Sequence, residues 1–177
     1  SLNNKIALIT GAYGDIGFSI SKAYLESGAT VVIVGSNKDH LNSMIEKLEL
    51  HSKSIMPFVA DVSDANQVKN MVDAVIDRYG KIDILVTAAG IQHREPVTEF
   101  DHNKWNKVLQ INLTGTFFCA QEVAKQMIKK NMGRIIMISS LTSEIGIPNI
   151  SAYAASRGGV KQLGKTMAVE LASSGMT

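Results

Sequence analysis

Short apolar runs alternate with longer amphipathic segments along the whole chain, and this alternation constrains the fold more than any other feature of the sequence. The apolar runs are uninterrupted, which is typical of parallel strands covered on both faces. In the amphipathic segments apolar residues recur every three or four positions, which predicts helices. The expected strands are Ile6–Thr10, Thr30–Gly35, Ser54–Ala60, Ile82–Thr87 and Arg134–Ser139, and the expected helices span residues 15–27, 38–49, 64–79, 101–130 and 151–173.

Strands that alternate with helices are joined by right-handed crossovers, which place the strands in one parallel sheet. We therefore expect an α/β fold with a doubly wound parallel sheet of the Rossmann type, in the strand order 3-2-1-4-5. A length of 177 residues suits one domain, so residues 1–177 are expected to form a single unit. Asp64 is expected to cap a helix start, and Gly28 and Gly80 are expected to cap helix ends.

The charge and composition argue against several classes of protein. The net charge is +2 and the basic residues are scattered, so we expect no basic face for nucleic acid. No uncharged apolar run is long enough for a membrane span. Cys119 is the only cysteine, which excludes an internal disulfide and a cysteine-based metal site, and no metal is expected. The start at Ser1 has no signal-peptide pattern, so we expect a cytoplasmic protein.

A glycine-rich loop, Thr-Gly-Ala-Tyr-Gly-Asp-Ile-Gly, follows the first expected strand and opens the first expected helix. Glycines let the backbone approach a pyrophosphate closely, and a helix start offers free amides and the positive end of its dipole. This placement favours binding of a dinucleotide over a plain strand-to-helix turn. The carboxylate of Asp15 would be unfavourable near phosphates unless it turned to solvent. The expected cofactor contacts in this loop are Gly11, Tyr13, Gly14, Asp15, Ile16 and Gly17.

The segment after the second strand bears on the choice between NADP and NAD. Many NAD-binding chains place an acid there to bind the 2′-hydroxyl of the ribose. This chain has no acid there, and Ser36 together with Lys38 would accept a 2′-phosphate. We therefore favour NADP over NAD as the cofactor. The alternative is that these residues form only a turn that caps the next helix.

Tyr153 and Arg157 lie four residues apart at the start of the last expected helix, so their side chains point the same way. Hydride transfer to a carbonyl needs a proton donor, and a free phenol keeps its proton up to about pH 10. A cation about 4 Å away stabilises a phenolate by about 4 kcal/mol at an effective dielectric of 20. The spacing predicts an acid–base tyrosine assisted by Arg157. Taken alone, the two residues would more often be an exposed helix pair.

These motifs, and the sequence as a whole, resemble the short-chain dehydrogenase/reductase family. Members commonly have Thr-Gly-x-x-x-Gly-x-Gly in the first loop, Asn-Asn-Ala-Gly after the fourth strand and Tyr-x-x-x-Lys in the last helix. This chain departs from all three motifs, since Asp15 replaces the middle glycine, Thr87-Ala88 replace the asparagines and Arg157 replaces the lysine. Arginine provides the positive field, but its planar fork is bulkier than an ammonium group.

The resemblance also assigns cofactor contacts that the spacing alone does not. It implies that the Asp61 side chain and the Val62 amide contact the adenine edge. It implies that Ala89 and Gly90, after the fourth strand, lie against the cofactor, as do Tyr153 and its cation. Without the resemblance, Asp61 could equally be a turn residue.

Two further catalytic residues follow from the resemblance. Ser140, thirteen residues before Tyr153, would hold the substrate oxygen at the end of the fifth strand. Asn112 would support a water that connects the cation to solvent. The implied catalytic set is therefore Ser140, Tyr153, Arg157 and Asn112. Asn112 could otherwise be a satisfied polar group in the core.

Two loops, residues 89–96 and 139–146, resemble the gluconate 5-dehydrogenase group most closely. They imply an NAD(P)(H)-dependent oxidoreductase that interconverts a carbonyl and a secondary alcohol on a small molecule. A sugar acid such as gluconate is the expected substrate, with Arg94 and Ser140 as its contacts. Arg94 could equally be a surface arginine. The alternatives are a 3-oxoacyl-acyl-carrier-protein reductase and a non-catalytic dinucleotide-binding relative.

The resemblance implies an assembly and a longer fold. Family members often form homodimers or homotetramers through helices that correspond to 101–130 and 151–173, so a homo-oligomer is expected. The family fold continues with a sixth strand, a substrate-covering part and a seventh strand. Residues 174–177 stand where the sixth strand would begin, so we expect a fold truncated before the sixth and seventh strands, with its substrate-covering part missing.

Overall fold

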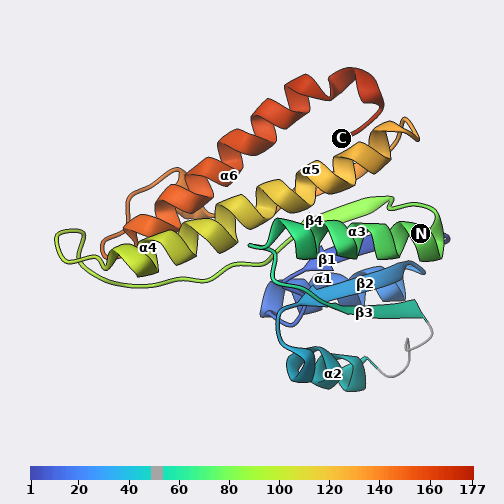
Figure 1. Cartoon of the computed structure of the whole chain (residues 1–177), viewed down its shortest axis with the longest axis horizontal. Helices are drawn as coiled ribbons and strands as arrows, with labels where there is room; N and C mark the ends of the chain where they lie inside the picture. The colour runs from blue at the N-terminus through green and yellow to red at the C-terminus, as the bar shows by residue number, and fades with distance from the viewer. Residues whose placement is uncertain (49–53) are drawn as a thin grey trace.

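The computed structural model of the chain describes residues 1–48 and 54–177, in which helices flank a five-stranded parallel sheet (Figure 1). The strands are β1 (Ile6–Thr10), β2 (Thr30–Gly35), β3 (Ile55–Val59), β4 (Ile84–Thr87) and β5 (Arg134–Met137). Their order is β3-β2-β1-β4-β5, and every pairing is parallel. The predicted doubly wound α/β fold with the order 3-2-1-4-5 is therefore confirmed.

Helices cover both faces of this sheet. They are α1 (Asp15–Glu26), α2 (Lys38–Lys47), α3 (Ala65–Tyr79), α4 (His102–Leu109), α5 (Gly115–Ile128) and α6 (Ser151–Glu170). Buried residues of α1 and α2 pack on one face, and buried residues of α3 and α5 pack on the other. α4 leads into α5, and α6 lies alongside both of them (Figure 1).

The central strand shows how the sheet organises the core. Leu8 in β1 pairs with Val32 of β2 and with Leu85 of β4, and all three side chains are fully buried. Leu8 faces the α3–α5 side, whereas its neighbour Ile9 faces the α1–α2 side. Successive side chains of a strand point to opposite faces, so an uninterrupted apolar run suits a strand with a core on each side.

The last three strands are shorter than the sequence predicted. β4 ends at Thr87 as predicted but begins two residues late, at Ile84. β5 ends at Met137, which pairs with Thr87, because the chain beyond it turns into the loop at the carboxyl end of the strand. β3 is an edge strand that contains Pro57, and its residues alternate between buried or half-buried and exposed. Proline cannot donate a backbone hydrogen bond, so it is tolerated at such an edge. On the outer side of β5, Met176 pairs in parallel with Gly133.

The predicted helix over residues 101–130 is present as a continuous helical segment from His102 to Ile128, but it contains a wider turn that was not predicted. The segment contains α4, a wider π-helical turn η2 (Gln110–Thr114), and α5. Such turns carry one extra residue, which periodicity does not reveal. Helix α3 ends at Tyr79 as predicted, whereas α1, α2 and α6 end one to three residues before their predicted ends, at Glu26, Lys47 and Glu170. Residue 49 of the predicted helix 38–49 lies outside the described residues.

The predicted helix caps are present. The Asp64 carboxylate accepts hydrogen bonds from the amides of Asn66 and Gln67 at the start of α3. These bonds, led by that of the Gln67 amide, hold the pKa of Asp64 below its usual value. Gly80 ends α3 in a left-handed conformation with φ 74°, and Gly28 follows α1 with φ 93°. Glycine adopts such positive φ values without steric cost.

Two expectations from composition concern Cys119 and membrane spans. Cys119 lies on the buried face of α5, and burial raises the pKa of its thiol to about 12. The thiol therefore stays protonated and unreactive at neutral pH. None of the helices in residues 1–48 and 54–177 is long and apolar enough to cross a membrane.

A buried carboxylate joins β1 and β4 at the amino ends of the strands. Asp83 is 6% exposed and accepts a hydrogen bond from the Ile6 amide at 2.8 Å. It also forms ion pairs with Lys81 at 2.9 Å and Lys5 at 3.7 Å. The charge is therefore compensated, and it links the two strands at the edge of the sheet opposite to the glycine-rich loop.

Replacing Asp83 with alanine is expected to lower the free energy of unfolding by about 2–3 kcal/mol, because the Ile6 amide loses its acceptor and two lysines lose their counter-ion. Urea denaturation followed by circular dichroism measures this change. Asp73→Ala is the control, because it removes the partner of Lys69 on the exposed face of α3 and should have little effect. Equal effects of the two variants would contradict the conclusion that the buried Asp83 carboxylate stabilises the contact between β1 and β4.

Candidate active site

The candidate site lies at the carboxyl ends of the central strands, where ligands bind in open parallel sheets. The glycine-rich loop after β1 and the loops after β4 and β5 meet there, beside the first turns of α1 and α6 (Figure 1). Each of these segments contains residues that the sequence singled out. The following contacts describe how closely they come together.

Two glycines of the first loop are required by close packing. Gly11 has φ 64°, and a β-carbon on it would lie 2.5 Å from the backbone of Ala89 in the loop after β4. A β-carbon on Gly17 would lie 2.3 Å from the carbonyl oxygen of Gly11. These contacts involve backbone atoms, which cannot move aside. Gly11 therefore lets two loops touch, and Gly17 lets α1 lie close to β1.

The start of α1 remains open in front of this packed loop. Gly14 is the N-cap residue, no side chain caps the helix, and a β-carbon on Gly14 would make only one ordinary contact. The helix start thus offers uncapped amides beside a backbone with free space, which fits the pyrophosphate of a dinucleotide. Asp15 is the first helical residue and its side chain is exposed. The expectation that its carboxylate turns to solvent agrees with this exposure.

Tyr13 crosses from the glycine-rich loop to the end of β2. Its ring covers Gly35, where a β-carbon would lie 2.2 Å from the ring, and its hydroxyl lies 3.2 Å from the Ser36 hydroxyl. The ring also meets His40 edge-on at 5.1 Å. Residues of α1 and α2 continue this region into a cavity of about 490 Å³, which Tyr13, Asp15, His40 and Lys47 help to line. Sequence reasoning placed Tyr13 and Ser36 here and missed His40.

Asp61 and Val62 follow β3 as expected, but their side chains already have partners within the chain. The Asp61 carboxylate accepts hydrogen bonds from the amide and the hydroxyl of Ser63, at 2.9 and 2.6 Å. It therefore forms the turn that the sequence left open as an alternative. The Val62 side chain is buried and packs against Gly115 at the start of α5.

The substitutions after β4 leave a polar atom without a partner. The Thr87 hydroxyl is buried and makes no hydrogen bond with any described residue. The neighbouring strand compensates in part, since the Thr10 hydroxyl accepts a hydrogen bond from the Ala89 amide at 3.4 Å. The Thr87 side chain therefore makes no hydrogen bond that ties β4 to another described segment.

Arg157 is buried at the centre of the site. Its Nη1 donates to the carbonyl oxygen of Ile138 at 2.8 Å, and its guanidinium carbon lies 5.2 Å from the centroid of the Tyr153 ring. Only 5% of Arg157 is exposed, and its Nε has no hydrogen-bond partner among the described residues. A β-carbon on Gly90 would lie 2.3 Å from its Nη2. The arginine fork therefore fits only because Gly90 has no side chain.

Asn112 lies in the π-helical turn η2 and is fully buried. Its carboxamide oxygen accepts a hydrogen bond from the Ile91 amide at 2.8 Å, and its nitrogen donates to the Ile91 carbonyl oxygen at 2.9 Å. The same nitrogen donates to the Ser156 hydroxyl at 3.1 Å. Asn112 thus joins the loop after β4 to α6, beside Arg157.

Ser140 starts a short 3₁₀ turn, η3 (Leu141–Ser143), that follows β5 and packs against α6. Its hydroxyl accepts hydrogen bonds from the amide and the hydroxyl of Thr142, at 3.2 and 3.0 Å. Its neighbour Ser139 instead donates to the carbonyl oxygen of Arg157 at 3.0 Å. Ser139 thus binds the backbone of α6, whereas the Ser140 side chain binds Thr142 in the turn η3.

Tyr153 lies in the first turn of α6 and is half-buried. Its backbone carbonyl accepts a hydrogen bond from the Ser156 hydroxyl at 2.7 Å. Its own hydroxyl makes no hydrogen bond with any described residue. The phenol is therefore held at its ring by the guanidinium of Arg157, while its oxygen stays available.

The loop that contains Arg94 is anchored at both ends while Arg94 itself remains exposed. The Glu95 amide donates to the Asn149 carbonyl oxygen at 2.9 Å, and the Glu95 carboxylate accepts from the Asp101 amide at 2.8 Å. Arg94 forms no ion pair with any residue that the structure describes. Among the described residues it makes no hydrogen bond with Ser140, Tyr153 or Arg157.

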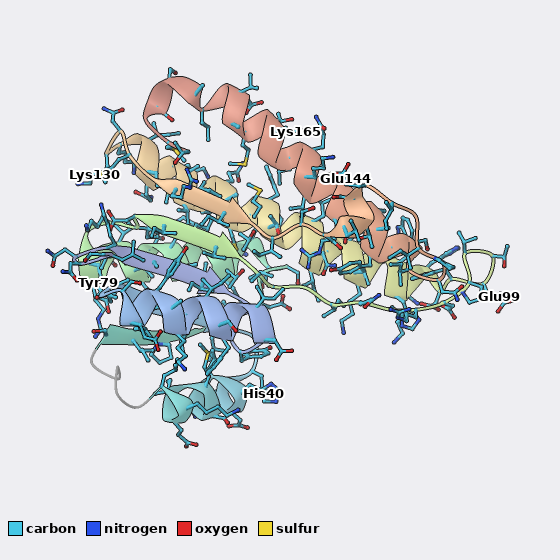
Figure 2. The ribbon with its side chains drawn as sticks, turned by 180° about the vertical axis from the view of Figure 1, so that it is seen from behind. His40, Tyr79, Glu99, Lys130, Glu144 and Lys165 are labelled. Carbon is cyan, nitrogen blue, oxygen red and sulfur yellow. The ribbon has the colours of Figure 1, made fainter. Side chains whose placement is uncertain are left out.

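The turn after Ser140 is tied to α6 by an ion pair between Glu144 and Lys161. Figure 2 shows Glu144 beside α6, the helix that contains the labelled Lys165. The hydrogen bond from Lys161 holds the pKa of the Glu144 carboxyl below its usual value. This tie fixes the turn that contains Ser140 against the helix that contains Tyr153 and Arg157.

The comparison with known proteins agrees with this arrangement. Residues 5–177 match the family described as short chain dehydrogenase. The chain belongs to the short-chain dehydrogenase family. It is 37% identical over 171 residues to the 3-oxoacyl-[acyl-carrier-protein] reductase of Thermotoga maritima, and 38% identical over 176 residues to the gluconate 5-dehydrogenase of Gluconobacter oxydans. These matches cover 97% and 99% of this chain and 70% and 69% of the relatives.

A solved structure is similar over the same extent. It is a gluconate 5-dehydrogenase from Burkholderia cenocepacia in complex with NADP and tartrate, with a TM-score of 0.93 and 36% identity over 99% of this chain and 69% of that one. This short-chain dehydrogenase is accordingly an NAD(P)-dependent oxidoreductase that interconverts a carbonyl and a secondary alcohol. Its cofactor is NADP or NAD, because solved relatives hold one or the other.

Sequence reasoning missed residues that support the dehydrogenase site without belonging to a motif. They are Ser156, which binds both Asn112 and the backbone of Tyr153, Thr142, which binds Ser140, and the Ile138 carbonyl that holds Arg157. Ser156 lies inside the Tyr-x-x-x-Arg segment, so its position was a usable signal. The carbonyl of Ile138 is a backbone group, for which no sequence signal exists.

Replacing Gly90 with alanine is expected to push the Arg157 fork away from the Tyr153 ring and to lower the free energy of unfolding by about 1–3 kcal/mol. Thermal unfolding measures the change. Adding Arg157→Lys should recover part of it, because lysine lacks the fork. Gly158→Ala is the control, since a β-carbon there meets no atom within 4 Å and alanine favours the helix. A Gly90→Ala variant as stable as the control would contradict this packing.

Proposed function

We propose that this short-chain dehydrogenase reduces and forms the carbonyl group of a small sugar acid, with Tyr153 as the acid–base group. The observation that carries the proposal is the stacking of a buried guanidinium on the ring of Tyr153, at 5.2 Å, beside the turn that begins at Ser140. A cation over an aromatic ring, withdrawn from water, favours negative charge on the phenol. The phenol is thereby the group proposed to exchange a proton with the substrate oxygen.

The proposed roles divide the reaction among the residues of the chain. The nicotinamide, when bound, supplies or accepts the hydride. In the direction of reduction, the Tyr153 hydroxyl gives its proton to the carbonyl oxygen, and the Ser140 hydroxyl holds that oxygen by a hydrogen bond. In the direction of oxidation, the Tyr153 oxygen accepts the proton of the alcohol. Arg157 stabilises the phenolate, and Asn112 positions the loop at Ile91 and, by resemblance, a water behind the cation.

The residues proposed to hold the cofactor lie at the carboxyl ends of β1, β2, β3 and β4. Gly11, Gly14 and Gly17 supply the packed loop and open helix start for the pyrophosphate. Ser36 and Lys38 after β2 favour NADP, since no acid stands at Ser36 to repel a 2′-phosphate. Asp61 and Val62 would contact the adenine edge, and Ala89 and Gly90 the rest of the cofactor.

A sugar acid is favoured as substrate by the relatives and by Arg94. The names of two of the relatives refer to gluconate. Arg94 is exposed, without an ion-pair partner among the described residues, in a loop that begins at the site. A guanidinium binds a carboxylate through two parallel hydrogen bonds, so Arg94 is proposed to hold the acid group of the substrate.

A 3-oxoacyl thioester is the second candidate substrate. One relative has this substrate in its name, and the two loops around the site expose aliphatic side chains, which suit an acyl chain better than a polyol. The most exposed are Val97, at 74%, and Leu141, at 67%. A non-catalytic dinucleotide-binding protein is the third candidate, because Asp15 and Arg157 replace residues that the family usually has.

A homodimer or homotetramer is also proposed, formed through α4, α5 and α6. The support is the family resemblance together with exposed apolar side chains on two of these helices, such as Phe117 at 38% and Val169 at 79%. A cytoplasmic location is proposed as well. It rests on the family and on the presence of a single cysteine in the chain.

Replacing Tyr153 with phenylalanine is expected to lower kcat for 5-ketogluconate by about 10²- to 10⁴-fold, because the proton donor is lost while the ring and its contact with Arg157 remain. NADPH oxidation followed at its absorbance band measures turnover, and a fluorescence titration should show unchanged cofactor binding. Tyr79→Phe, at the end of α3, is the matched control.

Three outcomes of this experiment separate the candidate functions. Turnover of a 3-oxoacyl thioester and none of 5-ketogluconate would favour the second substrate. Tight binding of NADPH without turnover of either compound, unchanged by Arg157→Lys, would favour the non-catalytic protein. Full activity of Tyr153→Phe would show that another group provides the proton.

Replacing Asp15 with asparagine is expected to tighten the binding of NADPH and NADH by about two- to fivefold, because one negative charge near the phosphates is removed without a change in size. The dissociation constants can be measured by fluorescence at two salt concentrations, since the gain should shrink as salt rises. Asp39→Asn, in the first turn of α2, is the control for the loss of one exposed charge. No gain for Asp15→Asn at low salt would place its carboxylate away from the phosphates.

A further inference from the structure

The hydrogen bonds of Ser140 assign a direction to its hydroxyl group. A serine hydroxyl has one proton to donate and two lone pairs that accept. In Ser140 the oxygen accepts from the Thr142 amide at 3.2 Å and from the Thr142 hydroxyl at 3.0 Å. Both acceptor positions are therefore filled by one residue. The Ser140 hydroxyl donates to no other residue that the structure describes, so its proton is the part that remains free.

We propose that Thr142 is a positioning residue, which fills the acceptor positions of Ser140 and so keeps the Ser140 proton directed at the substrate oxygen. The inference rests on the proposed function of Ser140. A serine with free lone pairs could also accept a hydrogen bond from an alcohol or from Tyr153. A serine whose lone pairs are filled can only donate, which suits an oxygen that gains negative charge as a carbonyl is reduced.

The turn around these residues is held rigidly enough to keep this direction. The Ser143 hydroxyl donates to the carbonyl oxygen of Ser140 at 2.6 Å, and the Ser143 amide donates to the same oxygen at 3.1 Å. Glu144, one residue further, pairs with Lys161 on α6. Thr142 itself is half-buried, so water competes less for its hydroxyl than at an exposed position.

Of the two donors, the hydroxyl of Thr142 is the one that depends on the side chain. The hydrogen bond from the backbone amide of residue 142 to the Ser140 oxygen is a common feature of turns that begin with serine, and any residue other than proline could donate it. Only serine or threonine there can also donate a hydroxyl. Valine has nearly the shape of threonine but no hydroxyl, so Thr142→Val leaves one lone pair of Ser140 open and changes little else.

The first test compares Thr142→Val with two other variants in steady-state reduction by NADPH. Thr142→Val is expected to lower kcat by about three- to tenfold with a smaller change in KM, because the lost interaction matters most when the oxygen becomes negative. Thr142→Ser should restore kcat. Ser143→Ala removes a hydroxyl that holds the same turn but leaves both acceptor bonds of the Ser140 side chain and the Ser143 amide bond in place, so it should lower kcat less than Thr142→Val does.

The decisive measurement combines Thr142→Val with Ser140→Ala. If Thr142 acts through Ser140, the double variant should be no slower than Ser140→Ala alone. Additive losses, or a Thr142→Val variant that loses melting temperature but keeps kcat, would overturn the inference and leave the proposed function intact. Absence of turnover in the parent protein, with NADPH bound, would instead contradict the proposed function and this inference with it.

Discussion

The burial of one guanidinium between β4, β5 and α6 determines how the site of this dehydrogenase is built. Arg157 is withdrawn from water and has no carboxylate partner among the described residues, so its charge is compensated by a carbonyl oxygen and an aromatic ring. Such a charge is costly unless its surroundings are polar and fixed. Gly90 leaves space for the guanidinium because it has no side chain, and Asn112 fixes the adjoining loop by its hydrogen bonds to Ile91.

The same arrangement separates the functions of neighbouring hydroxyl groups. Ser139 and Ser156 bind backbone carbonyls of α6, and both serve to hold the helix. Tyr153 is instead held through its ring, which contacts Arg157. Ser140 is held through its oxygen, which accepts two hydrogen bonds from Thr142. Ser139 and Ser156 thus support the helix, whereas the hydroxyls of Tyr153 and Ser140 keep a proton that no described residue accepts.

The sequence predicted the fold well because parallel strands and amphipathic helices have distinct periods. It also predicted which loops would meet, since the carboxyl ends of parallel strands lie at one edge. It could not predict the π-helical turn at Asn112, because periodicity does not report one extra residue in a turn. Nor could it predict that Tyr13 covers Gly35, or that Thr142 binds Ser140, because these contacts depend on side-chain conformations.

The position of Asp83 has a further consequence for where the sequence of such a protein tolerates substitutions. Its ion pairs join β1 and β4 at the amino ends of the strands, whereas the loops of the site lie at the opposite edge. Cohesion of the sheet and selection of a ligand are therefore governed by separate sets of residues. Loops at the carboxyl edge can accumulate substitutions, as at Asp15 and Thr87, while the anchoring of the central strands is untouched.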